Sequence, residues 1–153
     1  PVPVIIFAIV ALISWFFLAK TQFGRYIYAI GGNEKAALVS GLRVKQLKFL
    51  SYVINGMTAA LAGILLAARV AVGSPTAGES YDLLAITAVV VGGTSNAGGT
   101  GGILPSIIGV FIVTVMNNGM DLLGISGYYQ KIVTGVVVLL AVIIDRNNVN
   151  RNH

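Results

Sequence analysis

Uncharged, apolar runs alternate with short polar stretches along this chain. Residues 1–19 hold no charged side chain, and further mainly apolar runs occupy residues 49–71, 82–93, 103–119 and 129–145. About 20 apolar residues in a helix cross the ~30 Å hydrocarbon core of a bilayer. The pattern therefore predicts an all-α membrane protein, a polytopic transmembrane helical bundle with about five membrane segments in this chain.

Composition supports this class and excludes several others. Of the 153 residues, 56% are hydrophobic and 10% are charged, whereas soluble domains carry about 25% charged residues. The absence of cysteine excludes disulfides and thiolate metal sites. No Ser/His/Asp set, paired carboxylates or metal cluster stands out, so we expect no catalytic residues, no metal and no cofactor. The chain begins at Pro1 and is apolar from its start, which indicates a fragment of a longer membrane protein.

Basic residues gather in one polar stretch, residues 20–48. Six of the ten Lys and Arg residues lie there, against a single acid, Glu34. Because Lys and Arg are retained on the cytoplasmic side of a membrane, this stretch is predicted to be a cytoplasmic loop. The same rule places the tail after Asp145 in the cytoplasm and the turn at 73–81 outside. That path requires residues 82–93 to cross most of the membrane.

A short helix signature lies inside the basic loop. Asn33 can cap a helix by accepting a hydrogen bond from the first turn, and Glu34 places a negative charge where the helix dipole favours it. Gly41 can adopt the left-handed conformation that ends a helix. The sequence thus predicts a helix at 34–40, whose small residues Ala36 and Ala37 give it a nearly smooth face.

Two other segments are candidates for close helix packing or for a transport pathway. The run at 49–71 carries small residues every four positions, a spacing that lets helices approach closely in lipid. Asn55 is a polar residue inside this predicted span. It could form a hydrogen bond to another helix, or it could contact the substrate. The second segment is a glycine-rich stretch at 92–102. The candidates in these two segments are Asn55, Ala59, Gly63, Ala67, Gly92, Gly93, Thr94 and Ser95, and Asn117 and Asn118 join them from the end of the run at 103–119.

Several ordered motifs resemble one family. The stretch FGRYIYAIGGNEKAALVSGL resembles the coupling loop in permease subunits of bacterial ABC importers for simple sugars, the ribose-type branch. SYVINGMTAALAGILLAAR, AITAVVVGGTSNAGGTGG, VMNNGMDLLGISGYYQKIV and LLAVIID resemble it in the same order. The resemblance covers nearly the whole chain and corresponds to the C-terminal half of such a permease. The chain departs from the family pattern at Leu84, where an acid is common, and at Thr100, where a basic residue is frequent.

The resemblance implies a set of partners in the bacterial plasma (inner) membrane. Two permease subunits, expected to be identical, would form the pathway within the lipid, two cytoplasmic ATPase subunits would power it, and an extracytoplasmic binding protein would deliver a sugar such as ribose. No nucleic acid is implied. Family coupling helices dock on the ATPase, which would assign that contact here to Gly32, Asn33, Glu34, Lys35, Ala36, Ala37, Leu38, Ser40 and Gly41.

Other interpretations stay open from the residues themselves. We expect a transport subunit that is not itself an enzyme, with ATP hydrolysis in a separate partner chain. A secondary transporter or a channel could instead use the glycine-rich stretch as a re-entrant filter, and a membrane anchoring subunit would move nothing. Scarcity of charges within the spans argues against a proton-coupled carrier. A phosphate-binding loop would need a lysine after its last glycine, and none is present. The helix at 34–40 has its own alternative, an interfacial helix packed on its own subunit.

Overall fold

The computed structural model describes the backbone of residues 2–151 and the side chains of residues 2–145, so Pro1 of the first predicted span lies outside it. All regular secondary structure in this described part is helical, which confirms the predicted fold class. The chain divides into two compact units, Pro1–Glu79 and Ser80–His153.

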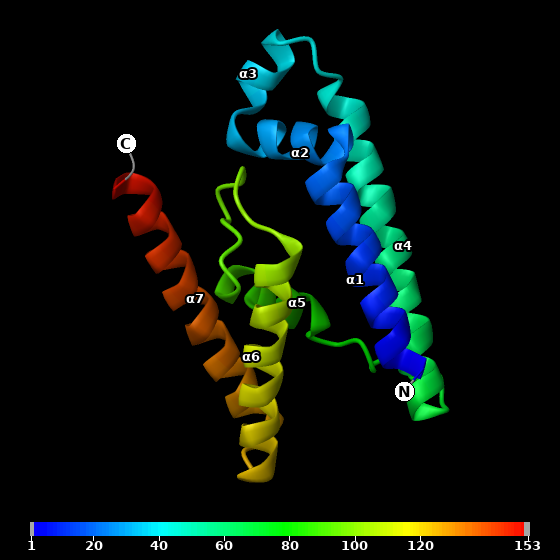
Figure 1. Ribbon diagram of the computed structural model, residues 1–153. Helices are drawn as coiled ribbons and strands as arrows, with labels where there is room; N and C mark the ends of the chain where they lie inside the picture. The colour runs from blue at the N-terminus through cyan, green and yellow to red at the C-terminus, as the bar shows by residue number, and fades with distance from the viewer. Residues whose placement is uncertain (1, 152–153) are drawn as a thin grey trace. The chain divides into compact units, whose positions relative to one another are not determined.

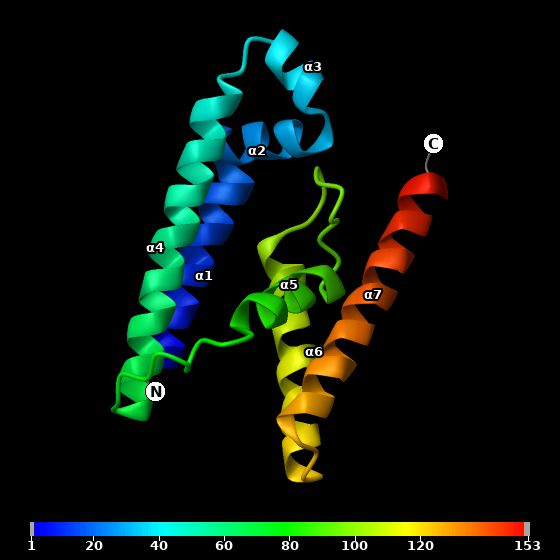
Figure 2. The ribbon, with the colours of Figure 1, turned by 180° about the vertical axis from the view of Figure 1, so that it is seen from behind.

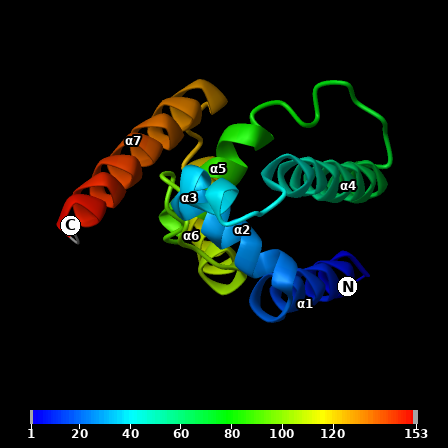
Figure 3. The ribbon, with the colours of Figure 1, turned by 90° about the horizontal axis from the view of Figure 1, so that it is seen from above.

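The first unit contains two long helices and two short ones. Its elements are α1 (Val2–Lys20), α2 (Gln22–Gly32), α3 (Glu34–Val39) and α4 (Val44–Val70). Helix α2 contacts each of the other three, and α3 also contacts α4. Figure 1 shows α2 lying across the direction of α1, and Figure 3 shows it running from α1 toward α3. The predicted loop at 20–48 is therefore mostly helical, and it contains α2, a helix that the sequence pattern did not indicate.

The second unit is built around its shortest helix. Helix α5 (Tyr81–Val91) contacts both α6 (Ile103–Leu122) and α7 (Gly127–Arg151). Figure 2 shows this group from behind. Most of the buried residues of the unit lie on these three helices, and Thr87 is fully buried. The buried residues are Thr87, Ala88 and Val90 on α5, Gly109, Val113 and Met120 on α6, Ser95 in the loop between them, and Thr134 on α7.

Four helices of the described chain are long and apolar enough to cross a membrane. They are Val2–Lys20, Val44–Val70, Ile103–Leu122 and Gly127–Asp145. Helix α5, with 11 residues, is only about 16 Å long at ~1.5 Å per residue. A helix of that length cannot cross a ~30 Å core alone.

Residues 80–96 nevertheless run the full length of the apolar part of α7. At one end, Ser80 and Leu84 line a cavity together with Gly127 and Lys131, near the start of α7. At the other end, the Ser95 hydroxyl donates to the Asp145 carboxylate over 2.8 Å. The glycine-rich stretch thus extends the short helix to the end of the 19-residue span. That residues 82–93 cross most of the membrane, as the predicted topology requires, stays a prediction.

Several helix ends differ from the predicted spans, and helix α4 begins at Val44 instead of at 49. Helix α6 does not stop at Gly119 but continues to Leu122, and its C-terminal motif uses Gly124, whose φ is 70°. An Asn or Gly inside a helix costs at most about 1 kcal/mol relative to Ala, and burial of Met120 in the added turn offsets it. Helix α7 begins at Gly127 and continues through the polar residues to Arg151, beyond the predicted end at Asp145.

Candidate functional site

The N-terminus of α3 is organised as the sequence predicts. The Asn33 side-chain oxygen accepts a hydrogen bond from the Ala36 backbone N–H over 3.0 Å, which confirms the predicted cap. Glu34 accepts from Lys48 Nζ, on the first turns of α4, over 2.7 Å. Both side chains are about half exposed, so this ion pair contributes no more than ~1 kcal/mol. The Glu34–Lys48 ion pair therefore adds little to the stability of the unit, and its main effect is to position α3 relative to α4.

The C-terminus of α3 forms a Schellman motif. The Gly41 N–H donates to the Leu38 carbonyl and the Leu42 N–H to the Ala37 carbonyl, each over 3.1 Å. Gly41 has a φ of 83°, the left-handed conformation that the sequence predicts for it. Both ends of this six-residue helix are thus fixed by local hydrogen bonds. A helix this short would be marginal in water without them.

The exposed face of α3 is not the one that the sequence predicts. Ala37 is only 5% exposed, so it packs inside the chain and is not available to a partner. Leu38 and Val39 are 60% and 87% exposed. These two apolar residues, together with Ala36 and Ser40, form what we call the α3 face. Gly32, Asn33, Glu34, Lys35 and Gly41 are also exposed.

The predicted small-residue row on α4 is exposed in this chain. Asn55, Ala59, Gly63 and Ala67 all lie at the surface, and a Cβ built on Gly63 would meet nothing within 4 Å. No neighbour within the described residues therefore explains why the row is small. Its packing against another helix stays a prediction.

The glycine-rich loop is anchored to α7 through Ser95. The Ser95 hydroxyl donates to Asp145 Oδ2 and accepts from the Ala97 N–H over 3.2 Å. The Asn96 N–H donates to the same carboxylate oxygen over 3.0 Å, and the Ser95 N–H donates to the Thr100 carbonyl over 3.2 Å. We call the three residues Ser95, Asn96 and Asp145 the clasp. The sequence singles out Ser95 but misses Asp145, although that residue is an acid at the end of an apolar run.

This hydrogen bonding argues against a phosphate site in the loop. A phosphate cradle needs backbone N–H groups that point at the ligand. Here the N–H groups of Ser95, Asn96 and Ala97 all donate within the protein, and the Gly98 N–H donates to the Ser95 carbonyl. Among the described residues, no group of three His, Cys, Asp or Glu side chains is placed to hold a metal ion.

Other predicted residues of the loop lie where backbones meet. A Cβ built on Gly92 would lie 2.2 Å from the Pro105 carbonyl oxygen, so α5 and the start of α6 touch at this glycine. Gly93 has a φ of 99° and ends α5 by donating to the Val90 carbonyl. The Thr94 hydroxyl lies 3.4 Å from the Ser106 hydroxyl. These residues pack α5 against α6. Helix packing is one of the two roles predicted for them, and a place in the transport pathway is the other.

Asn117 and Asn118 are neighbours in sequence but differ in environment. The Asn117 side chain lines a cavity at the end of the second unit opposite the clasp. Its oxygen is buried and has no hydrogen-bond partner among the described residues. Asn118 is exposed.

Replacing Asp145 with alanine is expected to loosen the clasp. It would leave a part-buried hydroxyl and a backbone N–H without their acceptor, and such a loss costs about 1–3 kcal/mol. Asp145→Ala should therefore lower the unfolding temperature of the detergent-purified protein. Combined with Ser95→Ala it should lower it by less than the sum of the single changes, because the two side chains share one interaction. Asp82→Ala, at an exposed acid, is the control, and additive effects would contradict the clasp.

The fold defines a multi-pass helical membrane protein with an exposed helix in its basic segment. The family described as branched-chain amino acid transport system / permease component matches residues 2–142. This chain belongs to that family, and the resemblance to permeases found in its motifs is confirmed. Its multi-pass location in the bacterial plasma membrane agrees with the four helices that can cross a membrane.

Curated relatives are similar along nearly the whole chain. The ribose import permease protein RbsC of Bacillus subtilis is 53% identical over 146 residues, which cover 95% of this chain and 45% of that protein. RbsC of Escherichia coli K12 is 52% identical over 145 residues, with the same coverage. The xylose transport system permease protein XylH of Haemophilus influenzae is 45% identical over 148 residues, covering 97% and 40%. The chain thus spans less than half the length of these relatives. No solved structure matches the chain.

Proposed function

We propose that this chain is part of the transmembrane permease subunit of an ATP-driven, binding-protein-dependent importer of a simple sugar. Ribose or a similar monosaccharide is the proposed substrate. The observation that carries the proposal is the 53% identity to a ribose import permease over 95% of the chain. The family description mentions branched-chain amino acids. Relatives at 43–53% identity are named for ribose and xylose, which supports a sugar as the proposed substrate class.

The chain is proposed to form part of the sugar translocation pathway. It is also proposed to receive the conformational change that ATP hydrolysis drives in the ATPase. The exposed residues of 33–41, without the buried Ala37, would contact a cytoplasmic ATPase subunit, and the two exposed apolar side chains of the α3 face support this. A second, identical permease subunit would cover the small-residue row on α4. An extracytoplasmic sugar-binding protein would dock at the opposite side of the membrane. The chain itself would hydrolyse nothing.

A re-entrant filter is not favoured by the geometry of the glycine-rich loop. A filter would place irregular backbone partway through the membrane, beside a water-filled path. Here the loop lies level with Asp145, where the apolar run of α7 ends. Helices α5 and α6 therefore pass each other as a hairpin whose turn is at one end of the unit.

Sugar uptake by cells that carry the complete importer tests the proposed function. Cells that lack their own ribose importer should accumulate radiolabelled ribose when given the full-length permease that contains this chain, its ATPase and its binding protein. Replacing the Walker A lysine of the ATPase should abolish accumulation, because that residue holds the phosphates of ATP. Leucine is the control substrate. Accumulation of leucine but not of ribose or xylose would contradict the proposed sugar.

A further inference from the structure

Helices α5 and α6 are joined by contacts between their backbones. A Cβ built on Gly109 of α6 would lie 1.8 Å from the Ala88 carbonyl oxygen of α5, and one built on Gly92 would lie 2.2 Å from the Pro105 carbonyl oxygen. Backbone atoms cannot rotate aside as side chains do, so moving one helix against the other would disturb both contacts at once. Helices α5 and α6 therefore behave as one rigid pair.

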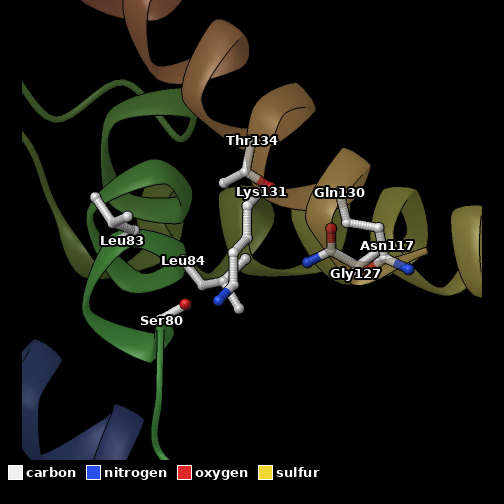
Figure 4. Close-up of a pocket in the computed structure, with 8 residues that line it drawn as sticks. All are labelled: Ser80, Leu83, Leu84, Asn117, Gly127, Gln130, Lys131 and Thr134. Atoms are coloured by element: carbon white, nitrogen blue, oxygen red, sulfur yellow. The ribbon is translucent and has the colours of Figure 1, made fainter. Parts of the chain in front are cut away.

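Helix α7 is held to this pair at its beginning. The turn before α7 is closed by side-chain hydrogen bonds, since Gln130 Nε2 donates to Asp121 Oδ1 over 2.6 Å and to the Ile125 carbonyl over 2.9 Å. Figure 4 shows this end, where Thr134 of α7 and Leu84 of α5 line one small cavity. Thr134 is buried. The first turns of α7 thus have a fixed place beside the α5–α6 pair.

The last turns of α7 are held in a different way. A cavity of about 430 Å³ lies between them and the end of α5, and Val90 of α5 and Leu140 of α7 are among the apolar residues that line it. Whatever fills this cavity in a longer permease, the two helices are separated there. Beyond it, Asp145 accepts hydrogen bonds from the Ser95 hydroxyl and the Asn96 N–H. The clasp thus connects the last turn of this span to the glycine-rich loop.

The clasp is easier to open than the contact between α5 and α6. Asn96 is exposed and Asp145 is partly exposed, so water reaches both hydrogen bonds of the clasp. A hydrogen bond that is exchanged for one to water is lost at a small net cost. Separated backbones in a packed contact gain no such replacement. A motion within this unit should therefore open the clasp first, with α7 turning about residues 123–126, because hinges lie in loops and at the ends of elements.

We propose that the clasp is a latch of the transport cycle. When closed, it holds the end of α7 on the glycine-rich loop. When open, it lets that end swing away about the turn at 123–126 while α5 and α6 stay together. This inference rests on the proposed function and names the part of the chain that moves. In the predicted orientation the latch is at the cytoplasmic end of the span, where the sugar leaves and the ATPase acts.

Cross-linking the latch in its closed state tests the proposal. Ser95 and Asp145 are both replaced with cysteine in a cysteine-free full-length permease, which is reconstituted in liposomes with its ATPase and binding protein. A short bifunctional methanethiosulfonate then joins the two thiols through disulfides that a reductant can break. Ribose uptake should fall at least tenfold on cross-linking and return on reduction. Uptake that stays unchanged while mass spectrometry shows the cross-link would overturn the latch.

The matched control joins α6 to α7 at the opposite end of α7. Asp121→Cys with Gln130→Cys places two thiols across the turn, where the unchanged side chains lie within hydrogen-bond distance. The proposed swing needs no separation there, so the cross-linked control should keep most of its uptake. An equal loss of uptake in the two cross-linked variants would also overturn the latch, because any link to α7 would then be enough to stop transport.

Distances between spin labels measure the motion directly and replace the cross-link if the double-cysteine variant does not fold. Ala97 and Ile144 are exposed positions beside the clasp. The distance between labels there should differ by several ångströms between the nucleotide-free complex and the complex trapped with ATP and vanadate. Labels at the exposed Leu122 and Tyr128, across the turn, should keep one distance. One unchanged distance beside the clasp would overturn the latch. Absence of ribose and xylose uptake by the unchanged permease would instead overturn the proposed function.

Discussion

Replacing Gly109 with alanine should prevent the second unit from folding. A Cβ built on Gly109 would lie 1.8 Å from the Ala88 carbonyl oxygen and 2.7 Å from the Gly92 backbone nitrogen. Both are backbone atoms of the α5 segment, so no side chain can rotate away to make room. Helices α5 and α6 would have to separate, which would open the contact that buries Thr87, Ala88 and Val113.

The size of this effect follows from the rigidity of the contact. Added methylenes in a packed core usually cost about 1–3 kcal/mol because neighbouring side chains adjust. Here a backbone has to move, so the loss should reach or exceed the upper end of that range. The amount of correctly folded permease in the membrane should fall strongly, as measured by size-exclusion chromatography of a fluorescent fusion.

Gly119→Ala is the matched control for Gly109→Ala. It makes the same chemical change on the same helix, but nothing lies within 4 Å of its Cβ. Alanine is also favoured over glycine in a helix interior by up to about 1 kcal/mol. Gly119→Ala should therefore fold at least as well as the unchanged protein. Equal yields for the two variants would contradict the close approach of α5 and α6.

The contrast between Gly63 and Gly109 shows what a spacing pattern can predict. The repeat of small residues around Gly63 identifies a smooth face of α4, but it does not say what covers that face, and no described residue does. Gly109 belongs to no obvious repeat. Its close partner, Ala88, is on another helix, and only the fold brings the two together. Packing between helices is therefore the part that the sequence could not supply.

Local chemistry was predictable, while distant contacts were not. The caps at Asn33 and Gly41 depend on residues within a few positions, so the sequence contains all of their information. The Ser95–Asp145 hydrogen bond joins residues 50 positions apart. Helix α2 was missed because its glycines suggest a turn, although its start is capped by the Thr21 side chain.

Adding a charge to the α3 face should disconnect the permease from its ATPase. Val39 is 87% exposed, so Val39→Asp should leave the fold of the first unit intact. If this face seats in a groove of the ATPase, the new carboxylate is buried without a partner, and an unpaired buried charge costs several kcal/mol. Each ~1.4 kcal/mol is a factor of ten in binding. The ATPase should then fail to co-purify with the permease.

Position 39 is a sharper probe than position 37, which the smooth-face interpretation of α3 would favour. Because Ala37 is 5% exposed, a bulky residue there would displace α3 from its neighbours before any partner was involved. Loss of coupling in such a variant would carry no information about docking. Val39→Asp changes only what a partner would touch.

The measurement is sugar-stimulated ATP hydrolysis of the whole complex in liposomes, beside recovery of the ATPase with the tagged permease. Val39→Asp should lower the stimulation more than about tenfold while the permease inserts and purifies normally. Val72→Asp is the control, since that valine is 63% exposed and lies after α4 rather than on α3. If Val39→Asp keeps both association and stimulation, α3 is only an interfacial support of its own subunit. The ATPase would then have to contact another part of the permease.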